Sequence, residues 1–184
     1  MILYIHGFRS SSKARKGQIL KKHFENVLTP TLPISPLETV DFLDDIISKN
    51  KISLIIGSSL GGFYGLQCLK NHKIPTLLIN PSLKPWQSLE KQIGKHTKFN
   101  SKETFEWTKE HNKELKQIND KNSRKKAEQT LLDLFISTDD DILDHSNLDN
   151  QFPDVIIKYY NNSGHSFTRF EEILPFIKNK IEKQ

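Results

Sequence analysis

Short apolar runs alternate with longer mixed segments along most of the chain. The runs lie at residues 2–5, 27–28, 52–56, 75–79, 131–137 and 155–160. Between them, the pattern predicts helices over residues 12–25 and after Pro36, where apolar residues recur at helical spacing. A last helix is predicted over residues 170–181, covering the sheet. Strands that alternate with helices in this way indicate an α/β fold, with a mostly parallel central sheet and helices on both faces.

One stretch interrupts this alternation. Residues 82–130 form a long insertion between two predicted strands, and they are polar and rich in lysine. A chain of 184 residues is of a size for one domain. We therefore expect a single domain over residues 1–184, with residues 82–130 as an insertion within it.

The strand at residues 52–56 leads into the pentad Gly57-Ser58-Ser59-Leu60-Gly61, a G-x-S-x-G pattern between a strand and a predicted helix. This pattern is typical of a nucleophile elbow, a turn so tight that the central serine hydroxyl stands clear of the sheet. The glycines stand where a Cβ would clash with the strand or the helix. We expect Ser59 to be a nucleophile and Ser58 to point into packing. The alternative is an ordinary turn with a buried serine.

Candidates for an acid and a base follow in the order that this elbow requires, which is serine, acid, histidine. Asp139, Asp140 and Asp141 come after the strand at 131–137, and His165 comes after the strand at 155–160. Ligands bind beyond the carboxyl ends of strands in open α/β sheets, so both groups are expected near Ser59. His165 would act as general base, and an aspartate would hold its tautomer.

Motifs along almost the whole chain resemble those of one family. In order and at similar spacings they are Tyr4-Ile5-His6-Gly7-Phe8 with Ser10-Ser11, the run from Gly57 to Tyr64, Asn80-Pro81 with Lys84-Pro85, Thr138 to Asp144, and Gly164-His165 with Phe167. The chain is similar to small α/β-hydrolases, and more closely to the YqiA-type (UPF0227) family of compact bacterial esterases. The resemblance implies a compact α/β-hydrolase fold and a serine hydrolase that cleaves esters or thioesters of short to medium acyl chains.

The resemblance also implies finer roles. Asp140 matches the position of the acid in the family, and Asp141 and Asp139 are the alternatives. The backbone N–H groups of Leu60, after the nucleophile, and of Phe8, after the first strand, would form the oxyanion hole.

Two departures from the family pattern lie near the acid and the base. Asp139 stands where the family usually has glycine, and Asn162-Ser163 precede the histidine where the family is richer in glycine. Because Asp and Asn best replace glycine at positive φ, we expect both changes to be tolerated.

In the α/β-hydrolases, an insertion placed like residues 82–130 typically forms a cap that closes over the nucleophile and excludes water. Four aromatic residues of this insertion are candidates for the wall of an acyl pocket: Trp86, Phe99, Phe105 and Trp107. Ordinary packing within the insertion is the alternative for each of them.

The net charge of +5 comes partly from the insertion, notably from the run at residues 121–126. One interpretation is attraction of an anionic, acyl-CoA-like substrate. The pattern favours a solvated helix surface instead, because acidic residues are interleaved. No nucleic-acid-binding module accompanies the lysines, so a small-molecule acyl ester is the expected partner and nucleic acid is not.

The remaining composition excludes several classes of site. A single cysteine, Cys68, cannot form an internal disulfide and is expected in the core. No CxxC pair, HExxH motif or P-loop is present, so neither a metal nor another cofactor is expected. Neither a signal peptide nor a membrane span is visible, which predicts a cytoplasmic protein; the pattern leaves monomer and homodimer open.

Two functions other than hydrolysis remain compatible with these motifs. A non-catalytic module of the same fold could bind a small acyl compound or an acidic partner through its basic insertion, since fold does not dictate function. An acyltransferase would use the same site and pass the acyl group to an alcohol or amine instead of water.

Overall fold

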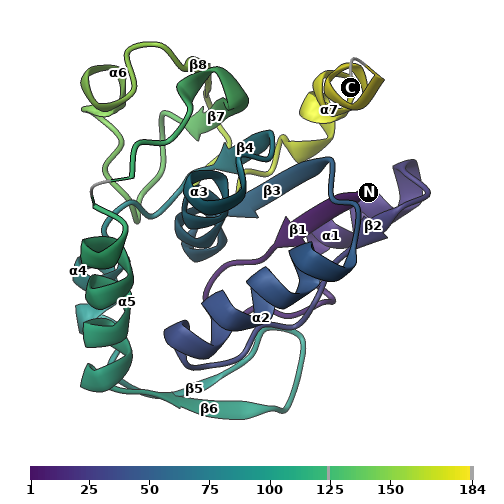
Figure 1. Ribbon diagram of the computed structural model, residues 1–184. Coiled ribbons are helices and arrows are strands. Elements are labelled where there is room, and N and C mark those ends of the chain that lie inside the picture. Colours follow the sequence, from purple (N-terminus) through teal and green to yellow (C-terminus); the bar gives the residue numbers. More distant parts are fainter. Residues whose placement is uncertain (124, 183–184) are drawn as a thin grey trace.

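A six-stranded sheet forms the centre of the molecule, and all of its pairings are parallel (Figure 1). The computed structural model describes residues 1–123 and 125–182. The strand order is β2-β1-β3-β4-β7-β8. The bounds are β1 (Ile2–Ile5), β2 (Val27–Leu28), β3 (Leu54–Ser58), β4 (Thr76–Ile79), β7 (Leu132–Ser137) and β8 (Ile156–Tyr160). Each strand lies within one of the apolar runs, except that β3 begins at Leu54 and extends through Ser58 into the pentad.

Helices cover both faces of this sheet. One face carries α1 (Arg15–His23), the 3₁₀ turn η3 (Phe170–Ile173) and α7 (Leu174–Glu182), and the other carries α2 (Pro36–Lys49) and α3 (Leu60–His72). Alternate residues of a strand point to opposite faces, so β1 contributes Tyr4 to one core and Leu3 to the other. Tyr4 joins Leu20 and Ile177, and Leu3 joins Leu43. The predicted α/β architecture is therefore confirmed.

The insertion contains its own elements. They are α4 (Pro85–Ser88), the 3₁₀ turn η1 (Glu90–Gln92), β5 (Gly94–Thr97), β6 (Thr104–Trp107), α5 (Lys109–Lys121) and the 3₁₀ turn η2 (Gln129–Leu131). β5 and β6 form a separate antiparallel hairpin. α5 lies alongside α2 and α4 (Figure 1). Trp107, Leu115 and Ile118 are buried in the same core as α2 and α3, so the insertion packs directly on the sheet domain.

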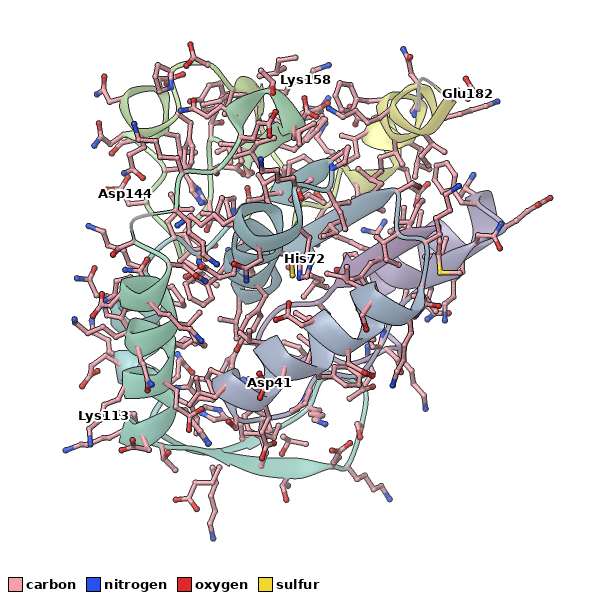
Figure 2. All side chains as sticks on the ribbon, in the orientation of Figure 1. Asp41, His72, Lys113, Asp144, Lys158 and Glu182 are labelled. Carbon is pink, nitrogen blue, oxygen red and sulfur yellow. The ribbon has the colours of Figure 1, made fainter. Side chains whose placement is uncertain are left out.

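Charged side chains give the insertion its polar surface. Lys113 on α5 points away from the body of the molecule (Figure 2), where its Nζ lies 2.9 Å from Glu110 Oε2. α6 (Leu148–Gln151) completes the helices, between β7 and β8. None of the helices within the described ranges combines the length and apolar character that a bilayer crossing needs.

Candidate active site

Ser59 lies at the turn between β3 and α3, with φ of 55° and ψ of −120°. A non-glycine residue at positive φ is strained, and such strain is typical of functional turns. The turn has no room for larger neighbours, since a Cβ at Gly57 would lie 2.4 Å from the Gly61 carbonyl oxygen and one at Gly61 would lie 2.1 Å from the Ile5 carbonyl oxygen. The Ser59 N–H donates to the Ile79 carbonyl oxygen at 3.0 Å, which fixes the turn to β4.

Asp140 lies in the loop after β7 and His165 in the loop after β8, and both side chains point toward this serine. His165 Nε2 lies 3.0 Å from Ser59 Oγ, and His165 Nδ1 lies 2.9 Å from Asp140 Oδ2 and 3.0 Å from Asp140 Oδ1. With Nδ1 donating to the carboxylate, Nε2 is left as the acceptor for the serine hydroxyl. The three side chains thus form one continuous chain of hydrogen bonds.

The environment of Asp140 favours its ionised form. Its side chain is 2% exposed. Burial raises the pKa of this carboxyl, but hydrogen bonds from His165 and from the backbone N–H groups of Leu143 and Ile142 outweigh burial, so the pKa lies below its usual value. The backbone donors lie at 2.9 Å (Ile142) and 3.0 Å (Leu143). Asp140 is therefore a buried anion held in a fixed orientation toward the histidine.

The neighbouring carboxylates have other environments. Asp141 is exposed, as is Asp144, which lies on the outer side of its loop (Figure 2). Asp139 accepts hydrogen bonds from the N–H groups of Ser163 (3.1 Å) and Gly164 (3.3 Å), so it holds the histidine loop and does not contact the imidazole. The expectation that Asp139 replaces a glycine at positive φ is wrong, whereas Asn162 does have a φ of 53°.

Asn80 joins three loops of the site. It is fully buried at the end of β4, with a φ of 42°. Its Oδ1 accepts from the Ser137 N–H at 2.7 Å, and its Nδ2 donates to the carbonyl oxygens of Gly164 (3.1 Å) and His165 (3.0 Å). The side chain therefore links β4, β7 and the histidine loop. The sequence contains the Asn80-Pro81 pair as part of a motif but does not indicate a bridging role for Asn80, because that role depends on contacts distant in sequence.

The loop after β1 passes close to the nucleophile. A Cβ at Gly7 would lie 3.2 Å from Ser59 Cβ and 3.3 Å from the Ser58 carbonyl oxygen, closer than ordinary contact, so a larger residue here would press on the nucleophile turn. Within the described part of the chain, neither the Phe8 N–H nor the Leu60 N–H donates to a backbone carbonyl outside the regular elements. Both N–H groups belong to residues that line the same cavity as Ser59. They are the candidates for an oxyanion hole.

His6 holds this loop in place. It is 5% exposed, its Nε2 accepts from the Leu32 N–H at 3.2 Å, and its Nδ1 lies 2.9 Å from the Gly7 carbonyl oxygen. Nδ1 therefore carries the proton. Burial lowers the pKa of His6 to about 4, with a further lowering by the charge of Lys98 against the opposing hydrogen bond to Gly7. The imidazole is neutral near pH 7 and serves as a fixed donor and acceptor.

A cavity of about 760 Å³ opens over Ser59 and His165. The four aromatic candidates for an acyl wall do not share it, since Phe99 lines it and the other three do not. Phe105 and Trp107 instead pack edge-on against Phe8, with ring centroids 5.5 and 5.1 Å away, and Trp86 packs against Phe63. Phe105 and Trp107 support the loop that carries the Phe8 N–H, and a place for them or for Trp86 in an acyl wall stays a prediction.

The described residues of the basic run, 121–123 and 125–126, do not line this cavity either. Arg124 lies outside the described residues, and Lys125 Nζ donates to Asn71 Oδ1 at 2.7 Å, next to the end of α3. The cavity draws its positive charge from a different segment, residues 9–16. These cations can be read from the sequence, but their position beside Ser59 follows only from the fold.

His145 is a second buried histidine beside the acid. Its Nε2 lies 3.1 Å from the Pro81 carbonyl oxygen, and its Nδ1 lies 3.8 Å from Asp140 Oδ2, beyond hydrogen-bond distance. Within the described ranges, Nδ1 is a buried atom without a partner. Burial lowers the pKa of His145, with the Pro81 bond and the Asp140 charge opposing. No motif in the sequence points to this residue, which falls in a polar loop.

Several solved structures share this fold over nearly the whole chain. A monoacylglycerol lipase from Paleococcus ferrophilus has a TM-score of 0.68 at 14% identity, covering 97% of this chain and 94% of its own. Est1E from Butyrivibrio proteoclasticus has a TM-score of 0.68 at 12% identity, covering 98% and 88%. An esterase domain from Rhodothermus marinus has 0.64 at 18%, covering 93% and 80%.

The match to a sequence family is more specific than the shared fold. A family model described as the uncharacterised protein family UPF0227 matches residues 1–181. The chain belongs to UPF0227, as its motifs predicted. Among residues 1–123 and 125–182, no group of three or more histidine, cysteine or acidic side chains is placed to hold a metal ion.

Proposed function

We propose that the chain is a serine hydrolase that cleaves carboxylic esters or thioesters of short to medium acyl chains through an acyl-enzyme. The observation that carries this proposal is the hydrogen-bond chain from Ser59 Oγ through His165 to Asp140. The structural likeness to a protein domain named as an esterase and to one protein named as a monoacylglycerol lipase supports the same reaction class.

The mechanism follows from the roles that these groups can fill. Ser59 Oγ attacks the ester carbonyl carbon while His165 Nε2 takes the hydroxyl proton, and Asp140 stabilises the imidazolium that forms. The N–H groups of Phe8 and Leu60 stabilise the negative charge on the carbonyl oxygen. The imidazolium then protonates the leaving alcohol or thiol. A water molecule, deprotonated by His165, hydrolyses the acyl-enzyme and frees Ser59.

The first test is hydrolysis of p-nitrophenyl acetate, butyrate and octanoate by the wild type and by Ser59→Ala. We expect Ser59→Ala to lower kcat by about 10⁴-fold or more. Ser58→Ala is the matched control, because Ser58 is the buried neighbour with no partner in the triad, and it should keep most of the activity. A larger loss in Ser58→Ala than in Ser59→Ala would overturn the assignment of the nucleophile.

The same assay separates the alternatives. A folded wild type that is inert on each p-nitrophenyl ester and on butyryl-CoA, and that reacts with no fluorophosphonate, would favour a non-catalytic binding module. An acyltransferase would show faster turnover when an alcohol or amine is added, with the acyl group recovered on the added acceptor.

A further inference from the structure

Cationic side chains dominate one side of the cavity that opens over Ser59. Arg9, Lys13, Arg15 and Lys16 line it, and none of the aspartates and glutamates in the described part of the chain does. They come from the loop after β1 and from the first turn of α1. This turn contains no acidic residue, although the N-terminus of a helix favours negative charge.

Most of this positive charge is not neutralised by a carboxylate. Arg15 approaches Glu171 at 3.4 Å, where both side chains are more than half exposed. Arg9 donates to the Thr97 carbonyl oxygen and lies over the Phe99 ring, with its guanidinium carbon 4.7 Å from the centroid. These contacts orient Arg9 but leave its charge unpaired. Among the described residues, neither Lys13 nor Lys16 forms an ion pair with a carboxylate.

Lys16 contacts the loop that carries His165. Its Nζ donates to the Ser166 carbonyl oxygen at 2.7 Å, one residue from His165. An ammonium has three donors, so one bond to a carbonyl leaves two for another acceptor. Burial lowers the pKa of Lys16 to about 8, with a further lowering by the charge of Arg15. The ammonium thus persists at neutral pH in a place that lacks a counter-charge.

Resting on the proposed function, we infer that this cavity selects esters or thioesters that carry a separate anionic group, a carboxylate or a phosphate, and that Lys16 and Arg9 contact that group. A charge-assisted hydrogen bond from Lys16 would bind the anion beside the scissile bond, and the unpaired charges of residues 9–16 would attract it. A purely structural role for Lys16, as a tether of the histidine loop, is the competing explanation.

Matched substrates separate these explanations. 1-Butyrylglycerol and 1-butyrylglycerol 3-phosphate share the acyl group and the ester bond and differ in the phosphate, and methyl hexanoate and monomethyl adipate differ in a carboxylate on the acyl side. We expect kcat/KM to be about tenfold higher for at least one anionic member than for its neutral partner, with the difference reduced by added salt. The pair that shows the difference identifies the side of the ester that bears the charge. Equal values within both pairs would overturn the inference.

Variants test whether Lys16 is responsible. Lys16→Met should raise KM for the anionic substrate and lower its kcat/KM by a larger factor than that of the neutral partner, so that most of the preference is lost. An equal loss on both substrates would show a tether only. Lys22→Met, an exposed position on the same helix, is the control. Lys13→Glu reverses a charge in the cavity at an exposed residue, so it should lower the preference even if Lys16→Met fails to fold.

Failure of this inference can be distinguished from failure of the proposed function. If neutral esters are cleaved and the anionic ones gain nothing, hydrolysis stands and selection of anions fails. If no ester is cleaved, calorimetric binding of 1-butyrylglycerol 3-phosphate to Ser59→Ala decides the inference by itself. Binding that is lost in the Ser59→Ala/Lys16→Met double variant supports it, and absence of binding overturns it.

Discussion

The carboxyl edge of the sheet and the insertion contribute in different ways to the cavity over Ser59. At the sheet edge, Ser59, Asn80 and Asp140 follow directly on the ends of β3, β4 and β7 or come shortly after them, and backbone hydrogen bonds hold them. The insertion reaches the same cavity through single residues such as Leu89 and Phe99. Strand ends position reacting groups with little freedom, whereas the insertion sets what surrounds them. The two regions therefore contribute different kinds of groups to the cavity: fixed polar side chains from the strand ends, and parts of the wall from the insertion.

The largest effect is expected at the sheet edge. Asp140→Asn should keep the fold but lower kcat by about 10⁴-fold, because an amide in place of the carboxylate allows the wrong imidazole tautomer. Steady-state kinetics with p-nitrophenyl butyrate measures this loss. Asp141→Asn, at the exposed neighbour, should change kcat by less than about twofold. A comparable loss in both variants would mean that the acid does not act through His165.

His6 should make the fold labile to acid. Its pKa is lowered to about 4 in the folded state, against about 6.5 in the unfolded chain, so only the unfolded chain gains a proton as the pH falls through this window. Stability is therefore lost between about pH 6.5 and pH 4, by up to about 3 kcal/mol. Urea unfolding at several pH values measures the slope. His6→Gln should reduce it, and an unchanged slope would show that other groups cause the acid lability.

A smaller effect is expected within the insertion, where two phenylalanines should differ. Phe105→Leu removes an edge contact with Phe8, so it should lower kcat by up to about tenfold without changing the preference for acyl length. Phe99→Leu alters the cavity wall, so it should change the acyl preference and KM with kcat nearly constant. Kinetics on the acetate, butyrate and octanoate esters distinguishes the two. A change of acyl preference in Phe105→Leu, with none in Phe99→Leu, would instead place Phe105 in the acyl wall.

The difference between the two regions also explains what the sequence could predict. Ser59, the acid loop and His165 follow apolar strands at recognisable turns, so pattern and chain order were enough to locate them. The aromatic residues of the insertion could not be assigned in this way. Trp107 is 2% exposed and donates to Asn112 Oδ1, a contact set by how the hairpin packs on α5 and the core. The role of the cations at residues 9–16 likewise depends on contacts distant in sequence, because the chain returns to them only at residue 165.

That return has a consequence for the chain during its synthesis. The bond between Ser59 and His165 joins residues 106 positions apart, whereas the nucleophile and the Phe8 loop lie on neighbouring strands β1 and β3. A nascent or cleaved chain that ends before residue 165 can carry the serine and its oxyanion donors without a base to activate it. Among the segments that form this site, the one that carries the proposed base is therefore the last to be synthesised.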